Sequence, residues 1–231
     1  MKKRSKSISN ALFDLFFPPI CYGCGNALNQ NERCICSYCQ TSLPKTNWQN
    51  RMANPLEKVF YGRVEVNRAT SFLHFRKNSI VQSFLHNLKY NSQKELGVVL
   101  GLYFASDLKK ASWVTDIEAV IPIPLHYRKL KTRGYNQSAL LSYGIAKGLK
   151  IKHELKALQR VRFTETQTKK DRFSRQENVK GAFKCKQFKY QNVLLVDDVT
   201  TTGATFESAI AAIKTANPSC KINVATLAIA E

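Results

Sequence analysis

The segment VLLVDDVTTTGAT, at residues 193–205, constrains the fold more than any other part of the chain. Its four leading apolar residues match a strand that is buried on both faces, which is typical of a parallel sheet covered by helices. A helical pattern, TFESAIAAIKTAN, begins at Thr205 directly after the loop. A strand, a short loop of small residues and a helix in this order indicate an α/β domain.

The rest of the chain repeats this alternation of strands and helices. Apolar runs predict strands at 68–75, 118–124, 155–161, 193–197 and 222–230. Helical spacing or composition predicts helices at 79–90, 94–110, 136–150, 171–179 and 205–216. We therefore expect a mainly parallel sheet flanked by helices. With 231 residues and 44% hydrophobic content, the chain is long enough for one sizeable core and a small second unit.

Five of the seven cysteines are concentrated near the start of the chain, in the pattern CYGC followed by RCICSYC. Two Cys-x-x-Cys turns point four sulfurs inward, which is the tetrahedral set that structural zinc prefers. The predicted zinc ligands are Cys21, Cys24, Cys36 and Cys39, and Cys34 is left outside the set. Disulfides are the alternative interpretation, and they would suit a secreted protein.

The chain is expected to divide near residue 50. Residues 1–50 are predicted to form an N-terminal helix and the zinc-binding domain, and the polar stretch 45–55 is predicted to be a linker. The basic and apolar start superficially resembles a signal peptide, but Asp14 interrupts it and no small-residue cleavage site follows. A docked helix is favoured over a membrane anchor. We expect a cytoplasmic protein with no stable membrane insertion.

Asp197 and Asp198 follow the apolar residues of the 193–205 segment, at the strand end where open α/β sheets bind ligands. The loop beyond them consists of small residues, Thr201, Thr202, Gly203, Ala204 and Thr205. Such a loop surrounds a phosphate with N–H groups and hydroxyls at a helix N-terminus. The carboxylates would repel a phosphate, but they accept hydrogen bonds from ribose hydroxyls or bind magnesium. A ribose 5′-phosphate satisfies both parts of the segment.

This segment resembles the phosphoribosyl pyrophosphate signature of type I phosphoribosyltransferases. One departure is Thr200, where an apolar residue is commoner. Further stretches resemble the ComF family of competence-associated proteins, and they cover nearly the whole chain. These stretches are LFDLFFPPICYGCG at 12–25, LKY at 88–90, PIPLHYRKLKTRGYNQS at 122–138 and QTKKDRFSRQENVKGAF at 167–183. The additional Cys34 is a second departure, and it changes little.

The resemblance implies a type I phosphoribosyltransferase-like domain over residues 51–231 behind a four-cysteine zinc finger. It implies binding of phosphoribosyl pyrophosphate with Mg²⁺, with Asp197 and Asp198 holding the ribose. Arg133, expected beside Asn136 at the start of a helix, is placed to pair with diphosphate oxygens. Lys89 is expected to face the same diphosphate. No residue is an obvious general base, so turnover as a phosphoribosyltransferase stays open.

The net charge of +20 favours an anionic partner. Between residues 128 and 189 there are 18 Lys and Arg against 4 Asp and Glu, with aromatic residues interspersed. Such a surface holds single-stranded DNA without sequence preference. Arg172 and Arg175, one helical turn apart, are candidate DNA contacts.

The resemblance implies a role in DNA uptake during natural transformation, with a competence helicase or a recombination protein as a partner. We therefore expect a phosphoribosyltransferase-fold protein that binds both phosphoribosyl pyrophosphate and single-stranded DNA. The alternative is a phosphoribosyltransferase of nucleotide or nucleobase salvage. A purely structural zinc adaptor would leave the 193–205 loop unexplained.

Overall fold

The computed structural model describes residues 17–90, 93–162 and 181–230. Its helices are α2 (Ser37–Thr41), α3 (Pro55–Lys58), α4 (Ile80–Tyr90), α5 (Lys94–Leu108), α6 (Tyr127–Arg133), α7 (Gln137–Leu149) and α9 (Ala204–Ala216), with 3₁₀ turns η1 (Trp48–Asn50) and η2 (Ser112–Val114). Its strands are β1 (Arg68–Phe75), β2 (Ala119–Pro122), β3 (Lys152–His153), β4 (Leu158–Arg160), β5 (Phe183–Cys185), β6 (Asn192–Thr200) and β7 (Lys221–Ala230). The helices expected near the start of the chain and at 171–179 lie outside the described residues.

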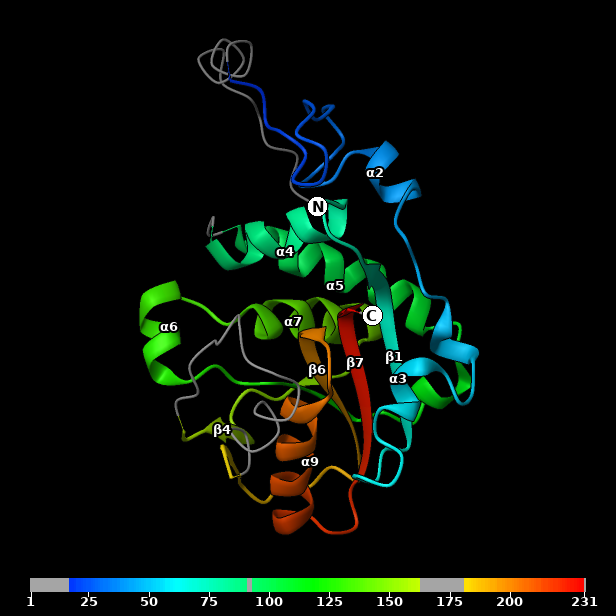
Figure 1. Cartoon of the computed structure of the whole chain (residues 1–231), viewed down its shortest axis with the longest axis vertical. Coiled ribbons are helices and arrows are strands. Elements are labelled where there is room, and N and C mark those ends of the chain that lie inside the picture. Colours follow the sequence, from blue (N-terminus) through cyan, green and yellow to red (C-terminus); the bar gives the residue numbers. More distant parts are fainter. Residues whose placement is uncertain (1–16, 91–92, 163–180, 231) are drawn as a thin grey trace.

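Five strands form one sheet in the order β1-β7-β6-β2-β3, and every neighbouring pair is parallel (Figure 1). The predicted parallel sheet flanked by helices is therefore confirmed. The strand predicted at 155–161 is present as β4, but it does not belong to this sheet. It pairs antiparallel with β5 in a separate two-stranded sheet.

The central strand β6 is covered on both faces, as its run of apolar residues predicts. Leu194 and Val196 pack into a cluster with residues of α4, α5 and α7. Val193 and Leu195 pack into a second cluster with residues of α3, α9 and the β4–β5 sheet. All four side chains are 0% exposed. Burial on both faces is what a continuous apolar strand requires, since neither face tolerates water.

The stretch 45–55 is not the linker that its polar composition indicates, because it packs along β1. The Thr46 N–H donates to the Phe72 carbonyl at 3.0 Å, and the His74 N–H donates to the Pro44 carbonyl at 2.9 Å. Trp48 is buried in the cluster of the α9 face. β1 is the edge strand of the sheet, so this stretch satisfies backbone groups that would otherwise be exposed for pairing with another chain.

The four-cysteine unit shares its core with the main body. Cys21, Ile35 and Cys39 belong to the same buried cluster as Phe84 and Leu88 of α4. Figure 1 shows this unit at one end of the molecule, beside α4 and α5. Among the helices of the described residues, none has the length and apolar character needed to cross a bilayer.

Two glycines let α5 and α7 cross in backbone contact. A Cβ added at Gly144 would lie 2.3 Å from the Val98 carbonyl oxygen, and one added at Gly101 would lie 2.2 Å from the Leu141 carbonyl oxygen. No side chain fits between the two helices at this point. The crossing matters for the site described below, because α7 begins at the carboxyl edge of the sheet.

We predict that Gly144→Ala destabilises the protein, although glycine-to-alanine changes in exposed helices stabilise by about 1 kcal/mol. Overpacking the crossing should lower the free energy of unfolding by about 2 kcal/mol or more. Denaturant unfolding measures this change. Lys147→Ala, at an exposed position of the same helix, is the control and should stay within about 0.5 kcal/mol of wild type. A stabilised Gly144→Ala variant would contradict the close crossing.

Candidate functional site

The two aspartates lie within β6 and not beyond it. The sequence predicts that the strand ends at Asp197, but the strand continues to Thr200, with Asp197 opposite Thr226 and Val199 opposite Ala228 of β7. Thr200, the departure from the phosphoribosyltransferase signature, is the buried last residue of this strand. Pairing with β7 therefore holds the backbone of the acidic pair rigidly at the carboxyl edge of the sheet.

Asp197 is held by hydrogen bonds to its Oδ1 atom. The Ser138 hydroxyl donates to it at 2.7 Å, and the Asp198 N–H donates at 2.9 Å. Burial away from water and the neighbouring charge of Asp198 raise the pKa of Asp197 to about 7, although both hydrogen bonds oppose this rise. Asp197 can therefore gain or lose a proton near neutral pH.

Asp198 is paired with Lys89, so the structure brings together two residues that the sequence analysis selected separately. The Lys89 Nζ atom lies 3.3 Å from Oδ2 of Asp198. The Val199 N–H donates to the other carboxylate oxygen at 2.8 Å. Lys89 comes from the last turn of α4, so α4 delivers a cation to the carboxyl edge of β6.

The predicted phosphate loop turns tightly into α9. Gly203 is the N-cap of this helix and has a φ of 76°. A Cβ at Gly203 would also lie 2.6 Å from Cγ1 of Val59, so both conformation and space require glycine. Ala204 is already the first residue of α9, and its N–H and those of the next residues have no partner within the helix.

Arg63 holds this loop in place. Its Nη1 atom donates to the Thr202 carbonyl and to the Val59 carbonyl, each at 2.9 Å. Its guanidinium also forms an ion pair with Glu207 in the first turn of α9. One arginine therefore ties the loop, the start of α9 and the segment after α3 to one another.

Arg133 lies at the end of one helix and not at the start of the next, which corrects the predicted location. Gly134, with a φ of 78°, ends α6 directly after it. Asn136 then caps α7, accepting from the Ser138 N–H and donating to the Ile123 carbonyl. The sequence RGYNQ therefore spans two helices, because glycine in the left-handed region interrupts the helical path.

Basic side chains nevertheless gather near the acidic pair. Partial burial lowers the pKa of Lys129, and three nearby cations, Arg160, Arg133 and Lys89, lower it further. Asp197 in turn acts on the pKa of Arg160, opposing the effect of burial there. Several cations close enough to repel one another form a surface that favours an anion. We call Lys89, Lys129, Arg133 and Arg160 the cation cluster.

Four residues of this arrangement were missed by sequence reasoning: Ser138, Lys129, Arg160 and Arg63. Ser138 carries a usable signal, since it lies two residues after a capping asparagine in the block 122–138. Arg160 and Arg63 follow no motif, and only the tertiary structure brings them to the site. The predicted DNA contacts Arg172 and Arg175 lie outside the described residues.

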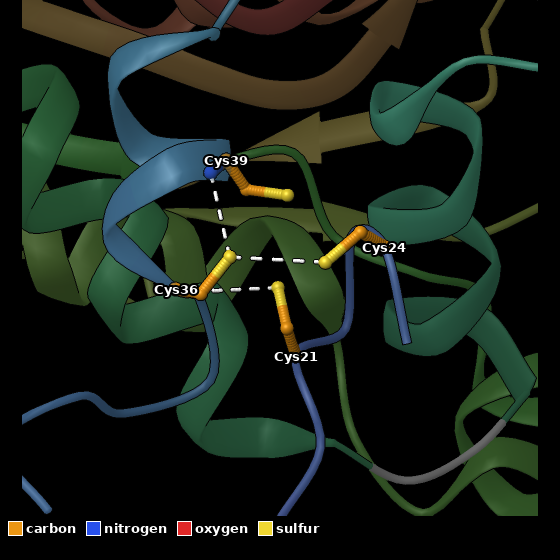
Figure 2. A group of neighbouring side chains, drawn as sticks. All are labelled: Cys21, Cys24, Cys36 and Cys39. Carbon is orange, nitrogen blue, oxygen red and sulfur yellow. Dashed lines mark hydrogen bonds between the residues drawn. The ribbon is translucent and has the colours of Figure 1, made fainter. Parts of the chain in front are cut away.

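The four predicted metal ligands form one cluster (Figure 2). The sulfurs of Cys21, Cys24, Cys36 and Cys39 all lie within 4.8 Å of one another, and those of Cys24 and Cys36 are 3.7 Å apart. Four ligands at the usual zinc–sulfur distance of about 2.3 Å would place their sulfurs about 3.8 Å apart. All seven cysteines are free thiols, so the disulfide alternative has no support.

Backbone groups also prepare this cluster for a cation. The N–H groups of Gly23 and Cys36 donate to the Cys21 sulfur at 3.4 and 3.3 Å. Burial opposes ionisation, but hydrogen bonds from Cys36, Cys24 and Gly23 together outweigh it and lower the pKa of Cys21 to about 7. Cys34 is not in the cluster, as predicted. Burial and the charge of Glu95 raise its pKa to about 12. The chain can therefore hold a metal ion on four thiolates.

Known proteins resemble the chain over these same elements. The family model of the phosphoribosyl transferase domain matches residues 136–230, which include α7, β6, the loop and α9. Competence protein F of Haemophilus influenzae is 30% identical over 204 residues, covering 82% of this chain and 88% of that protein. DNA utilization protein YhgH of Escherichia coli (strain K12) is 30% identical over 125 residues, covering 52% of this chain and 55% of that protein.

We predict that Asp197→Asn stabilises the protein in a pH-dependent manner. With a folded-state pKa of about 7, Asp197 binds its proton more tightly in the folded than in the unfolded protein. Wild-type stability therefore falls as pH rises from about 4 to about 7. Asparagine avoids this loss.

Thermal unfolding at pH 8 should show the variant to be about 1–2 kcal/mol more stable. Converting the whole pKa shift would give about 4 kcal/mol, but Asp197 is only partly buried, so solvent screening reduces this figure. The difference should vanish towards pH 4. Asp116→Asn, at an exposed position, is the control and should show no such trend. Equal stabilisation by Asp197→Asn at both pH values would contradict the charge-based explanation.

Proposed function

This chain belongs to the ComF family, and on that premise we propose that it binds phosphoribosyl pyrophosphate and handles single-stranded DNA during natural transformation. The main support for the proposal is that carboxylates, cations and a helix N-terminus lie close together at the carboxyl edge of β6. An acidic pair, a loop capped by Gly203 and the cation cluster surround one region. A ligand that has hydroxyl donors and two separate phosphate groups matches all three.

Each part of phosphoribosyl pyrophosphate has a counterpart in this arrangement. Asp197 and Asp198 would accept hydrogen bonds from the 2′- and 3′-hydroxyls of the ribose. The loop at Thr201 to Thr205 would hold the 5′-phosphate through N–H groups and hydroxyls at the start of α9. Lys89 would release Asp198 and turn to the diphosphate, together with Arg133 and the other members of the cluster. Mg²⁺ bound with the ligand would supply further neutralisation of the diphosphate, and carboxylates are suitable ligands for it.

Titration calorimetry with phosphoribosyl pyrophosphate and Mg²⁺ tests this site. The double variant Asp197→Asn/Asp198→Asn should bind at least about 100-fold more weakly, because both carboxylates lose the charge that strengthens their hydrogen bonds to the ribose and to Mg²⁺-bound groups. Wild-type affinity should fall about tenfold per pH unit below 7, because Asp197 becomes protonated there and loses the charge that strengthens its hydrogen bond to the ribose.

Asp116→Asn, an exposed carboxylate that precedes β2 and so lies towards the opposite edge of the sheet, is the matched control and should bind as wild type does. If the wild type does not bind the ligand, and DNA binds wild type and double variant equally, the ribose-phosphate proposal is wrong.

A transferase reaction is a second candidate, favoured by the pKa of Asp197, which lies near neutral pH. In such a reaction a ring nitrogen of the acceptor would bond to the anomeric carbon of the ribose. The bond from that carbon to the diphosphate oxygen would break, and the diphosphate would leave with the bonding electrons. Asp197 would accept the proton released by the acceptor nitrogen. Pyrophosphate released in the presence of a nucleobase measures this activity.

The DNA-binding part of the proposal is supported by α6. This helix has no buried residue, and its charged side chains are Arg128, Lys129, Lys131 and Arg133. Tyr127 and Leu130 are 65% and 42% exposed, and Arg128 lies over the Tyr127 ring at 5.9 Å. Burial lowers the pKa of His126, and the positive charges of Arg128, Arg160 and Lys129 lower it further. Arg160 belongs to β4, so β4 lies near α6 and adds to its positive charge. Cations beside an exposed aromatic ring suit an unpaired strand.

The double variant Arg128→Ala/Lys131→Ala should weaken binding of an oligonucleotide about tenfold. The slope of log K against log salt concentration should become shallower by about 1.4, since each lost phosphate contact on single strands accounts for about 0.7. Fluorescence anisotropy at several salt concentrations measures both. Lys58→Ala/Lys109→Ala removes the same charge from exposed positions elsewhere and should leave the slope unchanged. Equal slopes for both double variants would exclude α6 as a DNA contact.

The four-cysteine cluster completes the proposal with a structural zinc ion. Its four sulfurs lie within 4.8 Å of one another, which supports a four-thiolate zinc site, and such a closed site needs no further ligand. Thiolate ligands persist in a reducing compartment, so we place the protein in the cytoplasm, where incoming single strands would pass to a helicase-type or recombination partner.

A further inference from the structure

Tyr22 connects the four-cysteine cluster to both sides of Lys89. It lies between Cys21 and Cys24, in the first Cys-x-x-Cys turn. Its carbonyl accepts from Nδ2 of Asn87 at 3.2 Å, two residues before Lys89. Its hydroxyl donates to Oε1 of Gln93 at 2.5 Å, four residues after Lys89. The side chain and the backbone carbonyl of Tyr22 thus hold the chain after and before Lys89, respectively.

Packing reinforces these two hydrogen bonds. Gly23 approaches α4 so closely that an added Cβ would lie 3.1 Å from Cε1 of Phe84 and 3.0 Å from the Cys39 sulfur. The cluster and α4 are therefore in direct contact. On the other side, the Tyr135 hydroxyl donates to the Leu88 carbonyl at 2.6 Å. The end of α4 is held between the cysteine unit and the segment before α7.

We propose that Tyr22 is a positioning residue through which metal binding at the cysteine cluster sets the location of Lys89 in the ligand site. Four thiolates bound to one ion fix the backbone turn that contains Tyr22. The hydrogen bonds of Tyr22 then fix the positions of Asn87 and Gln93. The backbone of Lys89 then reaches the ligand site in one place, from which its side chain contacts Asp198 at 3.3 Å without ligand and can turn to the diphosphate when the ligand binds. The inference rests on the proposed binding of phosphoribosyl pyrophosphate, and it assigns the cysteine unit a role in that binding.

Tyr22→Phe removes the hydrogen bond to Gln93 and keeps the ring. It should raise the Kd for phosphoribosyl pyrophosphate about threefold to fivefold, as expected for the loss of one hydrogen bond, with the zinc content unchanged. Tyr38→Phe is the matched control, because Tyr38 occupies the second Cys-x-x-Cys turn but is 75% exposed. It should bind the ligand as wild type does.

The variant Lys89→Ala tests whether Tyr22→Phe weakens ligand binding by displacing Lys89. In that background Tyr22→Phe should cause no further loss, because the group that it positions is absent. By reciprocity, the ligand should raise the equilibrium affinity for zinc, measured by competition with a chelator, and it should do so more in wild type and in Tyr38→Phe than in Tyr22→Phe. Wild-type affinity in Tyr22→Phe, or an equal loss with and without Lys89, would overturn the proposal.

Amide hydrogen exchange separates this inference from the function on which it rests. Exchange in peptides covering residues 83–90 should become faster after zinc removal and in Tyr22→Phe, with or without the ligand. If wild type binds no phosphoribosyl pyrophosphate, the proposed function fails, and faster exchange would still support the link between the cluster and α4. Unchanged exchange in both cases would overturn that link.

Discussion

Two adjacent carboxylates at the end of a buried strand repel each other, and groups from several elements are needed to hold them there. The repulsion is reduced by a hydroxyl from α7, by Lys89 from α4 and by the positive charge of Arg160 from β4. In a parallel sheet the carboxyl ends of all strands meet at one edge, so the segments that follow β1, β2 and β6 all reach the acidic pair. The site therefore depends on the whole parallel topology and not on one loop.

The same edge also carries positive charges that repel one another. Arg133 and Arg160 both lower the pKa of Lys129, so the ligand-free protein bears an electrostatic cost near the site. A protein selected only for stability would not retain such a cluster next to a carboxylate whose pKa is already raised. Conflicts of this kind are expected where residues serve a ligand, since binding an anion relieves the repulsion.

The cysteine unit is too small to bury a core by itself, so it uses the core of its neighbour. Ile35 and four of the cysteines, Cys21, Cys34, Cys36 and Cys39, enter the same cluster as Phe84 of α4. A four-cysteine unit that shares a core with a helix is mechanically connected to that helix, and α4 brings Lys89 to within 3.3 Å of Asp198. This arrangement gives a physical reason for a four-cysteine unit and a phosphoribosyltransferase fold to occur in one chain.

Local patterns in the sequence predicted most of the described strands and the helices α4, α5, α7 and α9, but they missed β3, β5 and α6. The same patterns selected the four clustered cysteines and the acidic pair with its loop. These features follow from short-range rules: apolar runs, helical spacing, turn residues and ligand spacing. Tyr22 and Ser138 also lie inside patterns that were recognised, but their partners are far along the chain. A pattern of neighbouring residues carries no information about such partners.

Only the tertiary structure decided which charges meet. It placed Arg133 at the end of α6, separated β4 from the main sheet, and packed 45–55 along the edge strand. It also brought Arg63 to the phosphate loop. The physical reason is that electrostatic and packing energies depend on distance in space, while the sequence records only distance along the chain. The sequence alone identified the acidic pair as candidate ligand-binding carboxylates. It did not identify the surrounding groups that shift the pKa of Asp197.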